Sequence, residues 1–384
     1  MKNLRIILSY ILVAVISSMI TLSVFCDTPE EEYDKLDDIA GLIETYFIGE
    51  SDRAAMEDAA AAAMVDSLGD QWSYYMTAKD YEAYLEQMHN AYVGIGITIT
   101  VAKDNSGLDV VKVNEGGPAD EAGMLSGDVI IAVEGQSVAG MDTTAVRDLV
   151  RGKEGTQVRI GIRRGSETME LSVTRKTVQT PVAEYRLLDD GFGLVTIYNF
   201  DDRCSDETIA AIEYLRAQGA TALIFDVRNN PGGYKHELVR VLDYLLPEGP
   251  LFRSEDYRGK VDVDNSDARC LEIPMAVLVN GDSYSAAEFF AAALSEYDAA
   301  IVVGEKTCGK GYFQSSFELD DGSAVGLSIG KYTTPNGVSL ADVGIPPEVY
   351  VEVDEETAFL IYAGTLDPAE DPQIQAAIHA LKAE

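Results

Sequence analysis

The sequence is poor in the side chains on which metal sites and histidine-dependent catalysts rely. Its 384 residues include three histidines and four cysteines, and the cysteines form no C-x-x-C pair. Because a zinc site usually needs four such ligands at short spacings, neither a metal nor an organic cofactor is expected. Four cysteines are too few for a disulfide scaffold, although a Cys204–Cys270 bond stays open for a chain outside the cytoplasm.

Basic residues are also scarce. Lys and Arg total 29 against 65 Asp and Glu, which gives a formal net charge of −36. Proteins that bind nucleic acids need a basic surface to neutralise phosphates, so nucleic acid is not an expected partner. The acidic excess indicates a solvated surface. Hydrophobic residues make up 47% of the chain, enough for more than one folded core.

Charge is absent from one segment near the N-terminus. Residues 6–25 carry none, and they lie between the basic pair Lys2 and Arg5 and the acidic stretch CDTPEEEYDKLDD. A helix of about 20 residues spans a hydrocarbon core, and the positive end stays inside the cell. Residues 1–26 are therefore interpreted as a cytoplasmic tip and a single-pass signal anchor in the cell membrane, with the rest extracytoplasmic. A cleaved signal peptide or a lipidated Cys26 are the alternatives.

The rest of the chain changes its sequence pattern along its length. Helical spacing and Ala-rich runs come first, alternating apolar and polar residues begin near Tyr92, and apolar strands later alternate with helices. Strand–helix alternation of this kind predicts a largely parallel, layered core. The expected fold is a multidomain α/β chain, with a helical segment at 27–90, a mixed β/α module at 91–178, an α/β core at 179–352 and a helical tail at 353–384.

One serine lies where such a core gathers reactive groups. In GDSYSAAEFF, Ser285 stands between a strand that ends at Asn280 and a helix that begins near Ala286. Ligands collect at the carboxyl ends of parallel strands, and the first N–H groups of a helix stabilise negative charge. Ser285 is thus a candidate nucleophile and the Ala286 amide a candidate oxyanion donor. The alternative is that Ser283 or Ser285 only caps the helix.

A lysine, not a histidine, follows the next apolar strand. Lys310 lies between Gly309 and Gly311 in GEKTCGKGYFQ, and Gln314 shares its face if this segment is extended. Burial lowers the pKa of a lysine, so a neutral Lys310 can act as the base for Ser285. The neutral amide of Gln314 can orient that lysine without holding it protonated. The alternative is an ordinary surface lysine.

A third loop adds backbone donors. DVRNNPGGY follows an apolar strand and leads into a helix, and its tight turn at Gly232 and Gly233 exposes N–H groups. Such a turn can supply the other half of an oxyanion hole, or it is simply a connection from strand to helix.

Two other catalytic arrangements are possible from composition. A Ser–His–Asp triad has to use His236 with Asp226 or Asp282, and a Cys–His pair has to join Cys308 to His236. A lone histidine in the first turn of a helix is usually incidental, and Cys308 has no helix N-terminus beside it to lower its pKa. Both are therefore minor alternatives.

These stretches together resemble the C-terminal processing peptidases, or tail-specific proteases, which are serine endopeptidases with a Ser–Lys dyad. Four segments carry the resemblance: GDSYSAAEFFAAAL, GEKTCGKGYFQ, DVRNNPGGY and YTTPNGVSLADVGIPPE. It implies that Ser285 is the nucleophile, Lys310 the base and Gln314 its support. The chain departs from the family pattern at Tyr284 and Cys308, and Gln71-Trp72 stands in place of Pro-Tyr in GDQWSYYM.

The module at 91–178 resembles the PDZ domain inserted in this family. YVGIGITI is similar to the carboxylate-binding loop and its strand, so the turn of Gly94, Ile95 and Gly96 is expected to bind a peptide C-terminus while the peptide adds as a strand. The resemblance implies an endopeptidase that acts on proteins or peptides with exposed C-termini, and a homodimer formed through terminal helices. A catalytically silent PDZ scaffold is the alternative.

Overall fold

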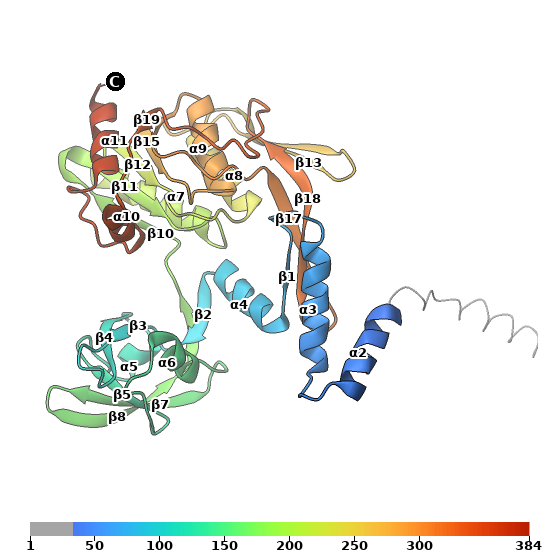
Figure 1. Cartoon of the computed structure of the whole chain (residues 1–384). Helices are drawn as coiled ribbons and strands as arrows, with labels where there is room; N and C mark the ends of the chain where they lie inside the picture. The colour runs from blue at the N-terminus through green and yellow to red at the C-terminus, as the bar shows by residue number, and fades with distance from the viewer. Residues whose placement is uncertain (1–33, 384) are drawn as a thin grey trace, which may run out of the picture.

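The computed structural model describes residues 34–383, so the predicted anchor at residues 1–26 lies outside the described residues. Within the part that is described, no helix is both long enough and apolar enough to cross a membrane. Figure 1 shows a layered core, a smaller module below it, and N-terminal helices that extend away from both.

The core is built on a six-stranded sheet in the order β10-β11-β12-β15-β16-β19. Strand β10 is antiparallel to β11, and all the other neighbours are parallel, as the strand–helix alternation predicts. The central strands are buried on both faces, which explains their unbroken apolar sequences. The strands are β10 (Ala183–Leu187), β11 (Phe192–Ile197), β12 (Ala222–Asp226), β15 (Met275–Val279), β16 (Ala300–Gly304) and β19 (Val349–Tyr350).

Helices cover both faces of this sheet. One face packs against α7, α8 and α9, and the opposite face packs against the C-terminal helix α11 through Ile374, Ala377 and Leu381. This arrangement leaves the carboxyl ends of the parallel strands to the connecting loops. The helical elements are α7 (Cys204–Ala217), α8 (Lys235–Leu245), α9 (Ala286–Glu296), α10 (Glu355–Tyr362), α11 (Pro372–Ala383) and a short 3₁₀ turn, η1 (Asp189–Gly191).

A second, antiparallel sheet stands beside the core (Figure 1). Its central strand β18 pairs with β17, β13 and, from far away in the sequence, β1. The N-terminal segment is therefore joined to the C-terminal half of the chain, which the local sequence pattern did not predict. The strands are β1 (Tyr74–Met76), β13 (Gly249–Asp256), β14 (Val261–Ser266), β17 (Tyr312–Glu318) and β18 (Ala324–Thr333).

The smaller module has its own hydrophobic core and its own sheet, in the order β3-β4-β5-β7-β8. Strands β7 and β8 form a hairpin, pairing along their full length around a turn at Gly165. A two-stranded ribbon of β2 and β9 joins the module to the rest of the chain. The elements are β2 (Ala91–Gly94), β3 (Ile97–Val101), β4 (Leu108–Val113), α5 (Pro118–Glu121), β5 (Val129–Val133), β6 (Gln136–Ser137), α6 (Thr143–Val150), β7 (Gln157–Arg164), β8 (Glu167–Thr174) and β9 (Lys176–Gln179).

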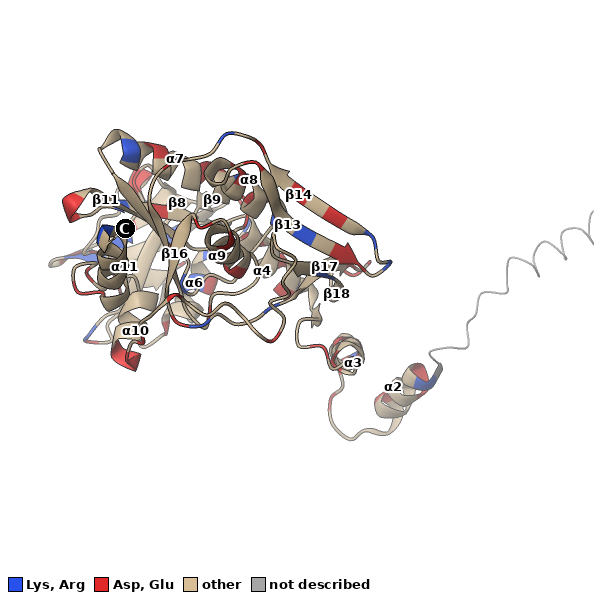
Figure 2. Ribbon diagram, turned by 90° about the horizontal axis from the view of Figure 1, so that it is seen from above, with Lys and Arg blue, Asp and Glu red and all other residues tan. Residues whose placement is uncertain are grey.

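The N-terminal segment is helical apart from β1. Its helices are α2 (Asp34–Tyr46), α3 (Arg53–Asp66) and α4 (Ala78–Met88). Thr77 caps α4, because its hydroxyl accepts a hydrogen bond from the Asp80 amide. Within the described residues, Asp and Glu lie on many different helices, strands and loops (Figure 2).

Candidate active site

Three loops meet at the carboxyl ends of neighbouring strands β12, β15 and β16. Gly232 lies in the first loop and Ser285 follows the second, and the two residues are in direct contact. A Cβ atom placed on Gly232 would lie 2.7 Å from Ser285 Cβ and 3.0 Å from Ser285 Oγ. Lys310 lies in the third loop. The expected convergence of the three loops is therefore present, because parallel neighbouring strands end at the same edge of the sheet.

Ser285 occupies the N-cap position of α9 in an unusual backbone conformation. Its φ of 57° and ψ of −125° are rare for a residue with a side chain. Its amide donates to Glu288 Oε2 at 3.1 Å, and its Oγ accepts a hydrogen bond from the buried Tyr332 hydroxyl at 3.3 Å. Strain of this kind persists where surrounding contacts fix the residue, and it presents the Ser285 hydroxyl toward Gly232.

Ser283 has a different role. Its side chain is fully buried, and its hydroxyl donates to the Val227 carbonyl at 2.7 Å and accepts from the Asn280 amide at 3.0 Å. These bonds tie the loop after β15 to the loop after β12. The two serines of GDSYSAAEFF are therefore not equivalent, and Ser283 is structural.

A buried carboxylate links the nucleophile loop to the lysine loop. Glu288 Oε1 accepts hydrogen bonds from the Thr307 hydroxyl at 2.6 Å and the Gly309 amide at 2.7 Å. Its Oε2 accepts from the Ser285 amide and from the Lys310 amide at 2.9 Å. Burial raises the pKa of Glu288, and these four hydrogen bonds oppose that rise. Glu288 thus holds the backbone of Ser285 and that of Lys310 on one carboxylate.

The Lys310 side chain is held by aromatic rings. Its Nζ lies 4.7 Å from the centroid of the Trp72 ring and 5.9 Å from that of Tyr284. Burial lowers the pKa of Lys310 below its ordinary 10.5, with Cys308 and Glu288 opposing the shift. Among the described residues no hydrogen bond joins Lys310 to Ser285, so the base and the nucleophile are close in the fold but not paired.

Gln314 does not contact Lys310 by a hydrogen bond in the described structure. Its Nε2 donates to the Tyr312 carbonyl at 3.2 Å and to Ser328 Oγ at 3.0 Å. The expected support of the lysine by this amide is therefore not seen here. The pairing of β17 with β18 shifts register between Phe313 and Gln314, an irregularity that sequence alternation does not reveal.

The candidate oxyanion donors lie on both sides of Ser285. A Cβ on Gly232 would lie 2.9 Å from Ala286 N, so the glycine backbone packs closely against both this amide and the Ser285 side chain. The Gly232 amide itself donates to Asn230 Oδ1 at 2.8 Å and is not free to bind an oxyanion in this conformation. Gly233 packs against Phe200, where a side chain has no room.

The structure does not arrange the residues of either alternative for catalysis. His236 is 62% exposed and lies 3.5 Å from Glu237, while Asp226 is paired with Arg228 at 2.5 Å. Partial burial raises the pKa of the Cys308 thiol, which disfavours the reactive thiolate. The proposed Cys204–Cys270 disulfide is also absent, since Cys204 is buried and free and Cys270 is exposed and free.

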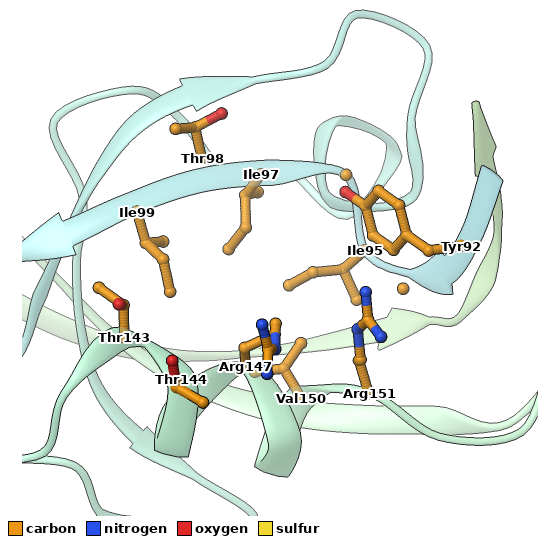
Figure 3. Close-up of a pocket in the computed structure, with 12 residues that line it drawn as sticks. Tyr92, Ile95, Ile97, Thr98, Ile99, Thr143, Thr144, Arg147, Val150 and Arg151 are labelled. Atoms are coloured by element: carbon orange, nitrogen blue, oxygen red, sulfur yellow. The ribbon is translucent and has the colours of Figure 1, made fainter. Parts of the chain in front are cut away.

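The smaller module carries a groove between β3 and α6 (Figure 3). The groove encloses about 300 Å³, and its lining includes the predicted carboxylate-binding turn of Gly94, Ile95 and Gly96. Gly96 adopts a φ of 73°, and the Ile95 carbonyl accepts a hydrogen bond from Ala119 N at 2.9 Å. The turn is thus fixed at the end of the groove where β3 begins.

Comparison with known proteins decides the family. Residues 191–351 match peptidase family S41, and residues 110–164 match the PDZ domain. The carboxy-terminal processing protease CtpA of Bacillus subtilis (strain 168) is 31% identical over 367 residues, covering 92% of this chain and 78% of that protein. The chain belongs to peptidase family S41. It is an S41 serine peptidase with a PDZ domain, and the resemblance drawn from the motifs is confirmed.

One further relative agrees with this assignment, and one solved structure shows the same fold. A Staphylococcus aureus (strain COL) protein described as "Probable CtpA-like serine protease" is 29% identical, covering 88% of this chain and 68% of that protein. The solved tricorn protease has the same fold over 91% of this chain and 34% of its own, with a TM-score of 0.51 at 17% identity. The silent-scaffold alternative is therefore not supported.

Three residues near the dyad were missed as functional candidates from the sequence. Trp72 was seen only as a departure from the family pattern, Glu288 only as a landmark, and Tyr332 not at all. A signal existed for Glu288, since it stands three positions after the nucleophile at the N-terminus of a helix, where a carboxylate accepts backbone N–H groups. No local signal connects Trp72 or Tyr332 to the site.

Proposed function

We propose that this peptidase cleaves proteins or peptides whose C-terminal tails it recognises through the PDZ groove, with Ser285 as nucleophile and Lys310 as general base. The observation that carries the proposal is the close packing of Gly232 against Ser285 and the Ala286 amide at the N-terminus of α9, with the partly desolvated Lys310 in the adjoining loop.

The reaction follows from these positions. The neutral Lys310 amine takes the Ser285 hydroxyl proton, and Oγ attacks the peptide carbonyl carbon. The Ala286 amide, with an amide of the Gly232–Gly233 turn, stabilises the oxyanion. Lys310 then gives its proton to the leaving amine. Water next gives a proton to Lys310 and attacks the acyl carbon, and Lys310 returns that proton to Ser285 Oγ as the acyl group leaves as a carboxylic acid. Since no hydrogen bond joins Lys310 to Ser285 among the described residues, the Lys310 side chain has to move toward Ser285 before the proton is transferred.

Anchoring and assembly are part of the same proposal. Residues 1–26 hold the enzyme in the cell membrane, with the peptidase on the extracytoplasmic side. A homodimer forms through the terminal helices, which is supported by the exposed Leu36, Leu42 and Phe359 on α2 and α10.

The test is cleavage of an unfolded protein with an apolar C-terminus by the full chain in detergent. Ser285→Ala and Lys310→Ala should each reduce cleavage at least about 1000-fold, the scale seen when a catalytic group is removed. Cys308→Ala is the matched control and should retain cleavage within about threefold. Full cleavage by both dyad variants would overturn the assignment, and loss of cleavage in Cys308→Ala alone would favour a cysteine peptidase.

A further inference from the structure

The most deeply buried tyrosine of the described residues lies against the nucleophile. Tyr332 stands near the end of β18 with 3% of its surface exposed, and its hydroxyl donates to Ser285 Oγ at 3.3 Å. Its amide donates to the carbonyl of Gly311, the residue after Lys310, at 3.2 Å. Tyr332 therefore contacts the nucleophile through its side chain and the lysine loop through its backbone.

Aromatic packing fixes the position of this hydroxyl. Measured between centroids, the Tyr332 ring lies 4.4 Å from Phe289, 5.5 Å from Phe252 and 6.3 Å from Phe313. These contacts need only the ring, so a phenylalanine would make them equally well. A buried hydroxyl is costly unless it forms a hydrogen bond, and among the described residues the Tyr332 hydroxyl bonds only to Ser285. The role of the hydroxyl, as distinct from the ring, therefore lies at Ser285.

The direction of this hydrogen bond leaves the Ser285 proton free for a base. A serine hydroxyl has one hydrogen to donate and two lone pairs with which to accept. Because Tyr332 donates to Oγ, it occupies one lone pair, and the Ser285 hydrogen has to point to another acceptor. The neutral amine of Lys310 is that acceptor once it reaches Ser285.

The same bond strengthens as the reaction proceeds. Negative charge grows on Oγ when Lys310 takes the proton, and a hydrogen bond to a charged acceptor is shorter and stronger than one between neutral groups. At 3.3 Å the bond is long for two neutral hydroxyls, which leaves it room to shorten. Burial raises the pKa of the Tyr332 hydroxyl above its ordinary 10.0, so the phenol keeps its hydrogen and remains a donor. An interaction that is stronger in the transition state than in the ground state lowers the barrier.

We propose that Tyr332 is a further catalytic residue of this peptidase, whose hydroxyl stabilises the negative charge that forms on Ser285 Oγ when Lys310 removes its proton. One proton moves, from Oγ to Lys310 Nζ, and Tyr332 keeps its own throughout. The bond weakens in the acyl-enzyme, where Oγ is an ester oxygen, and strengthens again as Oγ leaves. The inference rests on the proposed roles of Ser285 and Lys310, and it adds a third side chain to them.

The test compares Tyr332→Phe with the parent, using the full chain in detergent. Two rates are measured: cleavage of a tail peptide, and covalent labelling by a fluorophosphonate, which reacts with an activated serine hydroxyl. Tyr332→Phe should lower kcat about 10- to 100-fold with KM within about twofold, and should slow labelling by a similar factor. Slow labelling locates the defect at Oγ, because the probe does not depend on recognition of a tail.

Tyr297→Phe is the matched control. Tyr297 caps the other end of α9, and its hydroxyl donates to the Pro250 carbonyl at 3.0 Å. This variant also loses one tyrosine hydroxyl and one hydrogen bond, but about 18 Å from Ser285 along a helix that rises about 1.5 Å per residue. Its kcat and its labelling should stay within about twofold of the parent.

Tyr332→3-fluorotyrosine separates the hydroxyl from the packing of the ring. The substituted side chain keeps both, and fluorine makes the phenol a stronger donor. Labelling at pH 7 should therefore be at least as fast as in the parent. Slower labelling in this variant would overturn the inference even if Tyr332→Phe did not fold.

Unfolding curves and the fluorescence anisotropy of a bound tail peptide identify the folded variants. Normal kcat and normal labelling in folded Tyr332→Phe would overturn the role of Tyr332 and leave the dyad intact. Labelling or cleavage that persists in Ser285→Ala would instead reject the proposed nucleophile, and the role of Tyr332 with it.

Discussion

The active site and the PDZ groove handle charge in opposite ways. In the active site, Glu288 is fully buried and all its hydrogen bonds go to fixed partners in the Ser285 and Lys310 loops. In the groove, the Arg147 side chain is half exposed and forms an ion pair with Asp148, the next residue on its own helix. Chemistry needs reacting groups fixed to fractions of an ångström, whereas choice among ligands needs a charge that can change partners. We therefore expect small substitutions in the active site to lower activity strongly, and substitutions in the PDZ groove to change peptide binding modestly.

The largest effect is expected from Gly232→Ala. The new Cβ would lie 2.7 Å from Ser285 Cβ and 2.9 Å from the Ala286 amide nitrogen, so both groups would have to shift, and the φ of 92° adds backbone strain. Cleavage of a tail peptide should fall at least about 100-fold in kcat, while anisotropy still shows peptide binding in the PDZ groove.

Gly259→Ala is the matched control for that change. Gly259 also has a positive φ, 77°, but nothing lies nearer than Glu255 Oε1 at 4.0 Å. The Gly259→Ala variant has a similar backbone strain but makes no new contact with Ser285, so kcat should stay within about twofold of the parent. A Gly232→Ala enzyme with near-normal kcat would show that the close packing of Gly232 against Ser285 is not needed for catalysis.

A smaller effect is expected from Glu288→Gln. The amide keeps the shape but replaces one acceptor oxygen by a donor, which then faces N–H groups of the two catalytic loops. We expect kcat to fall about 10- to 100-fold with KM nearly unchanged, since the change misplaces Ser285 and Lys310 without touching the PDZ groove.

Thr307→Val separates positioning by Glu288 from general stability. It removes one of the four donors to Glu288 and leaves the two catalytic amides in place, so kcat should fall less than in Glu288→Gln. Unfolding curves and peptide anisotropy check that both variants keep the fold. An unchanged kcat in folded Glu288→Gln would refute the positioning role.

The smallest effect is expected on the pH profile. Only the neutral amine is a base, so kcat/KM should rise with pH through the pKa of Lys310, which burial lowers below 10.5. Trp72→Ala opens Lys310 to water, raises its pKa and moves the rising limb to higher pH, with a loss of about three- to tenfold near neutral pH.

Trp72→Leu provides the comparison for Trp72→Ala. Leucine keeps an apolar cover but removes the attraction between the ammonium and the ring, which favours the charged form. The rising limb should therefore stay in place or move to lower pH. Identical midpoints for the parent and Trp72→Ala would show that Trp72 does not set the protonation of Lys310.

Sequence patterns predicted those parts of the active site whose positions follow from the order of neighbouring strands. Ser285, Lys310 and the Gly232 turn follow consecutive buried strands, and parallel order alone brings their loops together. The cover over Lys310 was not predictable in this way, because Trp72 reaches it through the pairing of Tyr74 with Gly326. Long-range antiparallel pairing leaves no local pattern at either strand. Gln314 binds Ser328, and the Gly232 amide binds Asn230. Both hydrogen bonds depend on side-chain orientations that cannot be predicted from the spacing of residues in the sequence.

The pairing of β1 with β18 also has a consequence for the time at which the enzyme becomes competent. Strand β1 is made early, but its partner β18, at Ala324–Thr333, comes late in the chain, after both Ser285 and Lys310. Contacts between segments so distant in the sequence form only after the intervening chain exists. A growing polypeptide therefore carries its nucleophile and its base for some time before Trp72 can close over them, and the complete catalytic centre appears only near the end of synthesis.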